Sequence, residues 1–286
     1  MPLAELDLEA ALAPRIASLE PCWFAGLSGA LVDRFWAKPR TIAWARYSTA
    51  SWLGEPSGGP RIAIPGAADW CLEALPARFA GRFEAAAVAS TAAAQALATG
   101  LVCLEAGGAR DTVASLIRSV HAVAARGPGY DCSHSEPDIP FSVLVSIPLG
   151  ERYATLRLAE SLLHEAMHLQ LTLIEGHLPI ATDGAVGAAY SPWQQRLRPA
   201  KGLLHGLYVF AAIDAWLAAV QDSAAIGASD RLYAERRRAE IREEISMVSD
   251  LPTSIGLTPF GRILAAGLLA RLAVAGAEGR RSVQSA

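Results

Sequence analysis

The stretch Arg152–Ile174, RYATLRLAESLLHEAMHLQLTLI, decides the fold class that we expect for this chain. Its apolar residues, alanine and leucine above all, recur at spacings of three and four residues, which places them on one face of an α-helix. Alanine, leucine, glutamate and arginine, which all favour helix, make up more than half of it. The stretch therefore predicts a long helix that packs an apolar face into the protein interior.

The rest of the chain is also typical of a mainly α protein. The β-branched residues of Phe141–Ile147 lie between two prolines and are the best strand candidate. No linker or repeat divides the sequence, so we expect a single helical domain over residues 1–286 with a short β segment near 141–147. Loops are expected at 48–65 and 176–199, and further helices at 3–19, 68–106 (two helices or one bent one), 111–126, 199–220, 229–248 and 261–275.

Composition excludes several classes of function. The 286 residues are 52% hydrophobic and 19% charged, which is too apolar for a disordered chain. The net charge of -3 offers no basic face for nucleic acid. The four cysteines include no CxxC pair, which favours a reduced, cytoplasmic compartment.

Neither the N-terminus nor the apolar run at 85–104 indicates a membrane protein. The N-terminus carries acidic residues and lacks the basic start of a signal peptide. The uncharged run has the length of a bilayer span. However, it is mostly alanine with interspersed serine, threonine and glutamine, so we expect a buried helix and no membrane partner.

The segment His164-Glu165-Ala166-Met167-His168 is an HExxH motif within the long helix. Residues four apart lie one turn above each other on a helix, so both imidazoles can reach one metal ion. Glu165 can approach the open side of that ion, where water or substrate would bind. The motif predicts a metal site between two core helices, with His164 and His168 as ligands.

The third ligand decides which metal and which chemistry the site supports. Leu171 and Ile174 stand where a metzincin has glycine and histidine, which excludes that class. Glu175 lies about 10 Å beyond His168 along the same helix, too far to bind the same ion. His205, in the apolar segment GLLHGLYVF, is the best candidate, because a buried imidazole needs a partner. His134 is the second choice, and an inward-pointing acid among Glu235, Glu240, Glu243 and Glu244 stays open.

Two segments carry a resemblance to a known family. HEAMHLQL at 164–171, followed by YSPWQQRLRPAKGLLHGLYVF at 190–210, resembles the bacterial HEXXH motif domain found beside peptide-maturation genes. The preceding SHSEPDIPFSVLVSIP at 133–148 looks like the extended segment of that family. The resemblance covers residues 130–210. It implies a helical enzyme that depends on iron(II) and 2-oxoglutarate and hydroxylates the β-carbon of a side chain in a ribosomally made peptide.

Carried over by position, the resemblance implies His164, His168 and His205 as metal ligands and Arg198 as the partner of the 2-oxoglutarate carboxylate. A guanidinium can bind both carboxylate oxygens at once. The family often has arginine directly after the tryptophan, where this chain has Gln194, so Arg196 and Lys201 are further candidates for anchoring the co-substrate. We expect the aromatic residues Tyr190, Trp193 and Tyr208 to form walls of the pocket.

Three hypotheses for the function follow from these observations. The first is an iron(II)- and 2-oxoglutarate-dependent peptide hydroxylase with a precursor peptide as substrate. The alternative is a zinc hydrolase or peptidase, because three histidines also describe a catalytic zinc site and Glu165 would then activate the bound water. The third is a peptide-binding protein without catalysis. The role of Glu165, as an outer carboxylate, a ligand in place of His205 or a general base, stays open at this point.

Overall fold

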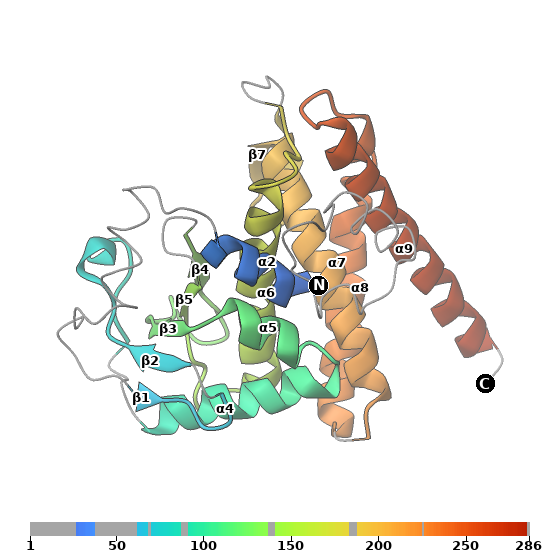
Figure 1. Ribbon diagram of the computed structural model, residues 1–286. Helices are drawn as coiled ribbons and strands as arrows, with labels where there is room; N and C mark the ends of the chain where they lie inside the picture. The colour runs from blue at the N-terminus through green and yellow to red at the C-terminus, as the bar shows by residue number, and fades with distance from the viewer. Residues whose placement is uncertain are drawn as a thin grey trace.

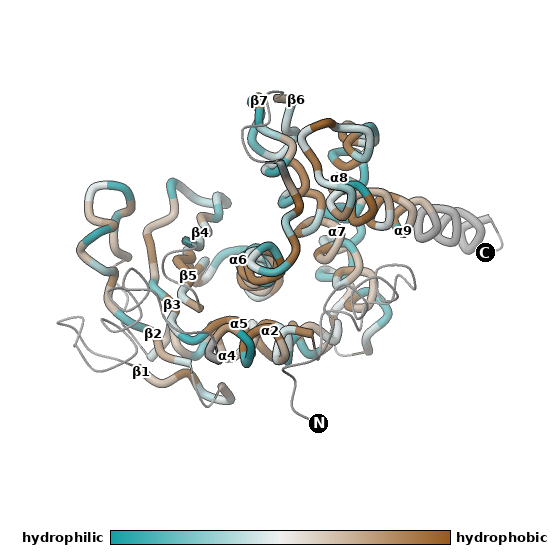
Figure 2. The backbone as a smooth tube through the Cα atoms, turned by 45° about the horizontal axis from the view of Figure 1, so that its top comes forward, coloured by the Kyte–Doolittle hydropathy of each residue, from teal (hydrophilic) through white to brown (hydrophobic). Residues whose placement is uncertain are grey.

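The central helix of the protein is α6 (Ala154–Glu175), which carries the HExxH motif. The computed structural model describes residues 27–37, 62–67, 70–86, 91–136, 141–182, 188–224 and 226–284, with side chains up to residue 273. Within these ranges the protein is mainly α with some β (Figure 1). Figure 2 views α6 nearly end on, with the sheet on one side and α7 (Ala200–Asp222) on the other.

Helices surround α6 on the sides that the sheet does not cover. Shorter helices pack on it from the N-terminal half, and α7 in turn contacts the C-terminal helices. The buried apolar residues of all these helices, from α2 to α9, form one continuous core cluster. The remaining helices are α2 (Leu27–Ala37), α4 (Thr91–Ala106), α5 (Arg110–Leu116), α8 (Ala228–Ser246) and α9 (Pro259–Gln284), with 3-10 turns η3 (Ala77–Phe79) and η4 (Leu251–Thr253).

A small mixed sheet places one edge strand beside the motif helix. Its order is β1-β2-β3-β5-β4, with β2, β3 and β5 parallel and the two outer strands antiparallel to their neighbours. The edge strand β4 contacts α6. The strands are β1 (Ile62–Ala63), β2 (Cys71–Glu73), β3 (Ser119–Ala122), β4 (Ser133–Ser135) and β5 (Ser142–Val145). A separate hairpin, β6 (Ala188–Ser191) and β7 (Arg196–Pro199), leads directly into α7.

Several expectations from the sequence are confirmed. The motif helix, the strand within 141–147 and the helices that begin near residues 199, 229 and 261 are present, each within a few residues of the expected start. The predicted helix at 3–19 lies outside the described residues. By length and composition α7 is the one described helix that could cross a membrane, and 72% of its most apolar window is buried inside the protein, as in the core helix of a globular domain.

The expectation of a single extended segment was wrong. Residues 71–73 form β2 where a helix was expected, and the helix expected over 111–126 ends at Leu116 and is followed by β3. All four residues of β3 are buried, so the strand lacks the alternation of polar and apolar residues that identifies a half-exposed strand. The loop expected at 176–199 contains the β6–β7 hairpin, and the loop expected at 48–65 contains β1.

Candidate functional site

The HExxH motif presents both of its histidines on one face of α6. The ring centroids of His164 and His168 lie 4.8 Å apart, as expected for residues one helical turn apart. Burial, together with the positive charge of Arg237, lowers the pKa of His164 to about 4. Burial, together with the neighbouring His164, lowers the pKa of His168 to about 3. Both imidazoles are therefore neutral at pH 7, the form that binds a metal ion.

His205 on α7 joins this pair from the facing helix. Its Nδ1 lies 3.3 Å from Nδ1 of His168, and the two rings are stacked. Two nitrogens bound to one tetrahedral ion at about 2.1 Å are about 3.4 Å apart, so this pair fits one ion. Nε2 of His205 lies 3.2 Å from Oε2 of Glu175. A carboxylate on the far nitrogen is the usual arrangement that orients a metal-binding histidine.

His164 is close to the pair formed by His168 and His205, but it does not complete a set of three metal ligands with them. His164 packs against Phe210, with ring centroids 5.4 Å apart. Among the described residues, no three His, Cys, Asp or Glu side chains are placed to hold an ion together. The structure thus brings the three expected histidines into one cluster, two of them at ligand spacing, without displaying a formed metal site between α6 and α7.

Glu165 is held between α6 and the edge strand β4. Its side chain is almost fully buried, and the Ser135 hydroxyl donates a hydrogen bond of 2.6 Å to its Oε2. Its other oxygen, Oε1, lies 3.9 Å from Nε2 of His164. The carboxylate is thus next to the histidine cluster, with one oxygen engaged by the sheet and the other facing the imidazole.

A pocket of about 500 Å³ lies over the three histidines and Glu165, and Arg198 of β7 lines it. The Arg198 guanidinium rests against Gly202 of α7, where a Cβ atom would lie only 2.8–3.0 Å from three guanidinium atoms. The guanidinium of Arg198 makes no hydrogen bond or ion pair with any other residue in the described part of the chain. Burial and the nearby Arg196 lower its pKa, and it remains a cation at neutral pH.

The other two candidate anchors are engaged elsewhere. Lys201 forms an ion pair of 2.9 Å with Oε1 of Glu175, the carboxylate that also bonds to His205. Arg196 is exposed and donates two hydrogen bonds, of 3.0 and 2.8 Å, to the side chain of Gln194. Of the three basic residues predicted to bind the co-substrate, Arg198 is therefore the one with an uncommitted guanidinium in the pocket.

The three aromatic residues expected to wall the pocket do not line it. Tyr208 is fully buried and donates a hydrogen bond to Gln170, whereas Tyr190 is half exposed on the hairpin. Trp193 stacks on Phe210 with ring centroids 5.2 Å apart. Its ring occupies a slot above Gly206, where a Cβ atom would lie 2.4 Å from two ring carbons. Trp193 therefore supports Phe210, which in turn contacts His164.

Two other histidines, His121 and His134, are engaged by neighbouring residues. His121 is buried in β3, and its Nδ1 lies 2.9 Å from the carbonyl oxygen of Ala74. His134 reaches the rim of the pocket, but its Nε2 lies 2.8 Å from Glu136. Neither environment favours a role as third ligand over that of His205.

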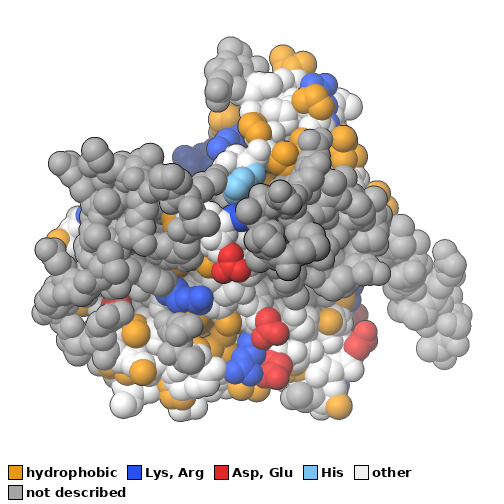
Figure 3. Space-filling model, in the orientation of Figure 1, with side chains coloured by type: hydrophobic (Ala, Val, Ile, Leu, Met, Phe, Trp, Pro, Cys, Tyr) orange, Lys and Arg blue, Asp and Glu red, His pale blue; other side chains and the backbone are white. Residues whose placement is uncertain are grey.

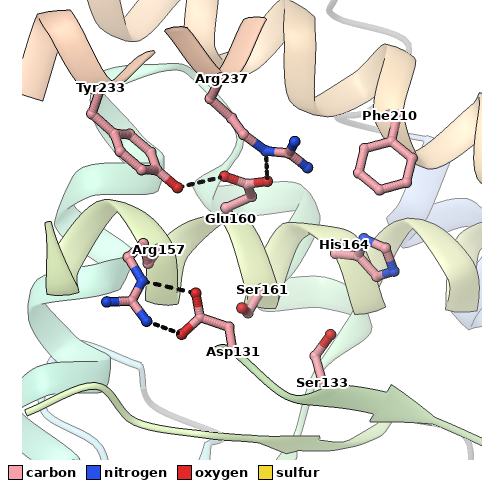
Figure 4. Close-up of a pocket in the computed structure, with 9 residues that line it drawn as sticks. All are labelled: Asp131, Ser133, Arg157, Glu160, Ser161, His164, Phe210, Tyr233 and Arg237. Atoms are coloured by element: carbon pink, nitrogen blue, oxygen red, sulfur yellow. Dashed lines mark hydrogen bonds and ion pairs between the residues drawn. The ribbon is translucent and has the colours of Figure 1, made fainter. Parts of the chain in front are cut away.

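A second pocket, of about 290 Å³, shares His164 and Ser133 with the first (Figure 4). Its walls hold two sets of interactions between α6 and its neighbours. Asp131 accepts two hydrogen bonds from Arg157, of 2.7 and 2.8 Å. Glu160 accepts hydrogen bonds from Tyr233 and Arg237 of α8, of 3.1 and 2.8 Å.

This second pocket was not predicted from the sequence. Its charged residues come from α6, α8 and the segment before β4, and no spacing along the chain connects them. The only local signal is that Arg157, Glu160 and His164 recur at helical spacing on α6.

The described part of the site is partly open to solvent. The side chain of His164 is 25% exposed, and Figure 3 shows that side chains of histidine and of basic residues reach the surface on this face of the molecule. No model of a known protein family matches the chain, and no curated protein sequence is significantly similar to it.

Proposed function

We propose that the protein is an iron(II)- and 2-oxoglutarate-dependent oxygenase that hydroxylates a side chain, at its β-carbon, in a ribosomally made peptide in the cytoplasm. The observation that carries this proposal is the position of Arg198. An uncommitted, partly buried guanidinium lines the same pocket as His164, His168 and His205. A site of this kind favours a small ligand that carries a carboxylate and also approaches the histidine cluster.

Each residue then has a defined task. His168 and His205, already at ligand spacing, would hold the iron together with His164 once the His164 side chain turned toward them. When bound, iron and 2-oxoglutarate together supply the oxidising chemistry for dioxygen activation. Arg198 binds the carboxylate of the co-substrate with two parallel hydrogen bonds, and Glu175 fixes the ring of His205.

A zinc hydrolase is the alternative, and the position of Glu165 favours it. The buried carboxylate lies next to His164, where it can accept a proton from a water molecule at the site. This reaction needs Glu165, but it needs no 2-oxoglutarate and therefore no arginine that binds a keto acid. The two functions therefore predict different consequences for variants of these two residues.

Anaerobic titration of the purified protein with Fe(II), with and without 2-oxoglutarate, tests the proposal. We expect the weak visible absorption band of an iron-bound keto acid only when both are present, and its loss in His168→Ala. Arg198→Met should raise the 2-oxoglutarate concentration needed by about 100-fold, because removing one partner of a charge pair costs ~2–5 kcal/mol. Arg196→Met, on the same strand but exposed, is the control and should change little.

The alternative predicts a different pattern. A protein that shows no such band, retains zinc and hydrolyses peptides until Glu165→Gln stops it would be a hydrolase. That result would overturn the proposed oxygenase function.

A further inference from the structure

We propose that the second pocket binds the side chain of the peptide residue to be modified, and that it selects a neutral or cationic side chain that donates hydrogen bonds over a carboxylate. This inference rests on the proposed function, because it makes the two pockets two halves of one active site. It is carried by the position of the pocket beside His164 and by the charges of its walls.

The two pockets meet at the histidine cluster. His164 of α6 and Ser133 of β4 line both of them. In Figure 4, His164 and Ser133 lie together at one end of the second pocket, with Phe210 above them. A side chain that enters this pocket therefore has its end bound by the polar walls and its stem next to His164.

On one wall of the pocket, Arg157 is paired with two carboxylates, of which Asp131 lines the pocket and Glu151 lies behind it. Arg157 donates two hydrogen bonds to Asp131 and a third, of 2.8 Å, to Glu151. These bonds raise the pKa of Arg157 despite its burial. With a further bond of 3.3 Å to the carbonyl oxygen of Arg152, four of the five N–H groups of this guanidinium are used. One N–H group is left, so a ligand carboxylate cannot bind it with two parallel hydrogen bonds without breaking one of these contacts.

On the opposite wall, the guanidinium of Arg237 is likewise close to more than one carboxylate, of which Glu160 lines the pocket. Arg237 bonds to Glu160 and Glu240, at 2.8 and 3.3 Å, and Glu244 lies 3.9 Å away. The aromatic face of Phe210 lies under the same guanidinium, 5.5 Å from its central carbon. The lining itself is balanced, with two carboxylates and two guanidinium groups, and further carboxylates lie behind both arginines. A ligand anion therefore meets no uncompensated positive charge in this cavity, whereas a cation or a neutral donor meets carboxylates that can accept from it.

The pocket also offers acceptors for a donating side chain. The Ser133 and Ser161 hydroxyls line it and make no hydrogen bond with any other side chain or carbonyl in the described part of the chain. Each oxygen of Glu160 accepts one hydrogen bond from the protein and keeps capacity for another. An amide, imidazole or amine group can use these acceptors, but a carboxylate, which only accepts, cannot bond to Glu160.

The first pocket has the opposite character. Its uncommitted group is the Arg198 guanidinium, which favours an anion. The charges of the two pockets therefore separate the reactants: the carboxylates of the co-substrate bind at Arg198, and the donating side chain of the peptide binds between Glu160 and Ser161. This separation prevents the co-substrate from occupying the substrate position.

Disulfide exchange at introduced cysteines measures whether each pocket prefers a cationic or an anionic group. The experiment needs no knowledge of the natural peptide. Ser161→Cys places a thiol in the second pocket, and Thr172→Cys places one in the first, on the same helix. Each full-length variant is equilibrated with equimolar cystamine, a cation, and dithiodiglycolate, an anion, together with their thiols. Mass spectrometry of the tryptic peptide 158–196, which contains no native cysteine, gives the ratio of the two adducts.

We expect Ser161→Cys to favour the cationic adduct by about ten-fold and Thr172→Cys to favour the anionic adduct, as for partly screened charges a few ångströms apart. Adding Glu160→Gln should reduce the cation preference at residue 161, whereas Glu235→Gln, an exposed acid on α8, should not. Equal adducts, or a preference for the anion, at residue 161 would overturn the inference.

The result at residue 172 is separate from the result at residue 161. If Arg198→Met does not remove an anion preference at residue 172, or if no such preference exists, the co-substrate assignment of the proposed function fails. The assignment of the second pocket to a donating ligand would then still stand or fall on the ratio at residue 161 alone.

Discussion

Among single residues, the two glycines of the GLLHG segment determine how the hairpin meets α7. Gly202 and Gly206 lie one turn apart, on either side of His205 in the sequence. Each leaves a gap that a side chain from the hairpin occupies, Arg198 at Gly202 and Trp193 at Gly206. Glycine inside a helix is about 1 kcal/mol less favourable than alanine. The two glycines therefore lower the stability of α7 and allow the two side chains to pack closely against it.

Gly202→Ala tests the position of Arg198 without removing its charge. The added methyl group would overlap the guanidinium, and because that group ends a flexible side chain, Arg198 should move rather than the helix. We expect the dissociation constant for 2-oxoglutarate to rise by about ten-fold, while alanine stabilises the helix by up to ~1 kcal/mol.

Calorimetric titration and thermal unfolding of the same variant give both quantities. Gly100→Ala in α4 is the matched control, because its nearest side-chain neighbours are 3.7 Å away, an ordinary contact distance. Unchanged affinity for 2-oxoglutarate in Gly202→Ala would show that the observed place of the guanidinium is not needed for binding.

Glu175 illustrates what spacing along the chain can and cannot predict. The i, i+4 spacing of His164 and His168 predicts their common face, because it depends only on helix geometry. The same reasoning excluded Glu175 from the metal, and in the structure it contacts His205 instead. That contact depends on how α6 and α7 cross, which no local pattern in one helix contains.

Among the elements, the long helices were predictable and the short strands were not. The helices α6 and α7 each run for more than 20 residues with an apolar pattern, long enough for the helical period to be unambiguous. By contrast, β2 and β3 have three and four residues, and their burial depends on neighbours from distant parts of the chain. Their pairing therefore had to come from the structure, as did the short edge strand β4, which pairs with β5 and carries Ser135 beside Glu165.

The contact between α7 and α8 contains a buried acid with two basic partners, and this leads to a prediction for this helix pair. Asp214 is almost fully buried on α7, and both Arg238 and Arg242 of α8 bond to it at 3.1–3.3 Å. Each single change to methionine should cost about 1 kcal/mol, because the other arginine still neutralises the acid. The double variant should cost about 3–5 kcal/mol, since it leaves a buried charge unpaired.

Urea denaturation of the two single variants and the double variant forms a double-mutant cycle for these arginines. Arg236→Met, at an exposed position of the same helix, is the control and should leave the free energy of unfolding nearly unchanged. The contrary outcome is that the double variant loses only the sum of the free energies of unfolding that the two single variants lose. That result would mean that Asp214 does not depend on having at least one arginine beside it.

Across the whole molecule, the motif helix is anchored to both halves of the chain by a buried polar network. The Tyr208 hydroxyl of α7 donates a hydrogen bond to Oε1 of Gln170 on α6. The amide nitrogen of Gln170 donates in turn to the Ser28 hydroxyl of α2, at 2.7 Å. All three residues are completely buried, so the network fixes the positions of three helices that are far apart in the sequence.

Tyr208→Phe removes one hydroxyl from this network without changing the shape of the ring. We expect the free energy of unfolding to fall by about 1–3 kcal/mol, because Oε1 of Gln170 loses the hydrogen bond from Tyr208 at a completely buried position. Tyr190→Phe, at a half-exposed position of the hairpin, should change it by less than about 0.5 kcal/mol. Equal effects in the two variants would mean that the network does not hold α2, α6 and α7 together. Tyr208 lines neither pocket. Loss of its hydroxyl should therefore lower the free energy of unfolding while leaving the affinities for metal and 2-oxoglutarate nearly unchanged. Such a result would distinguish residues that support the site from residues that bind its ligands.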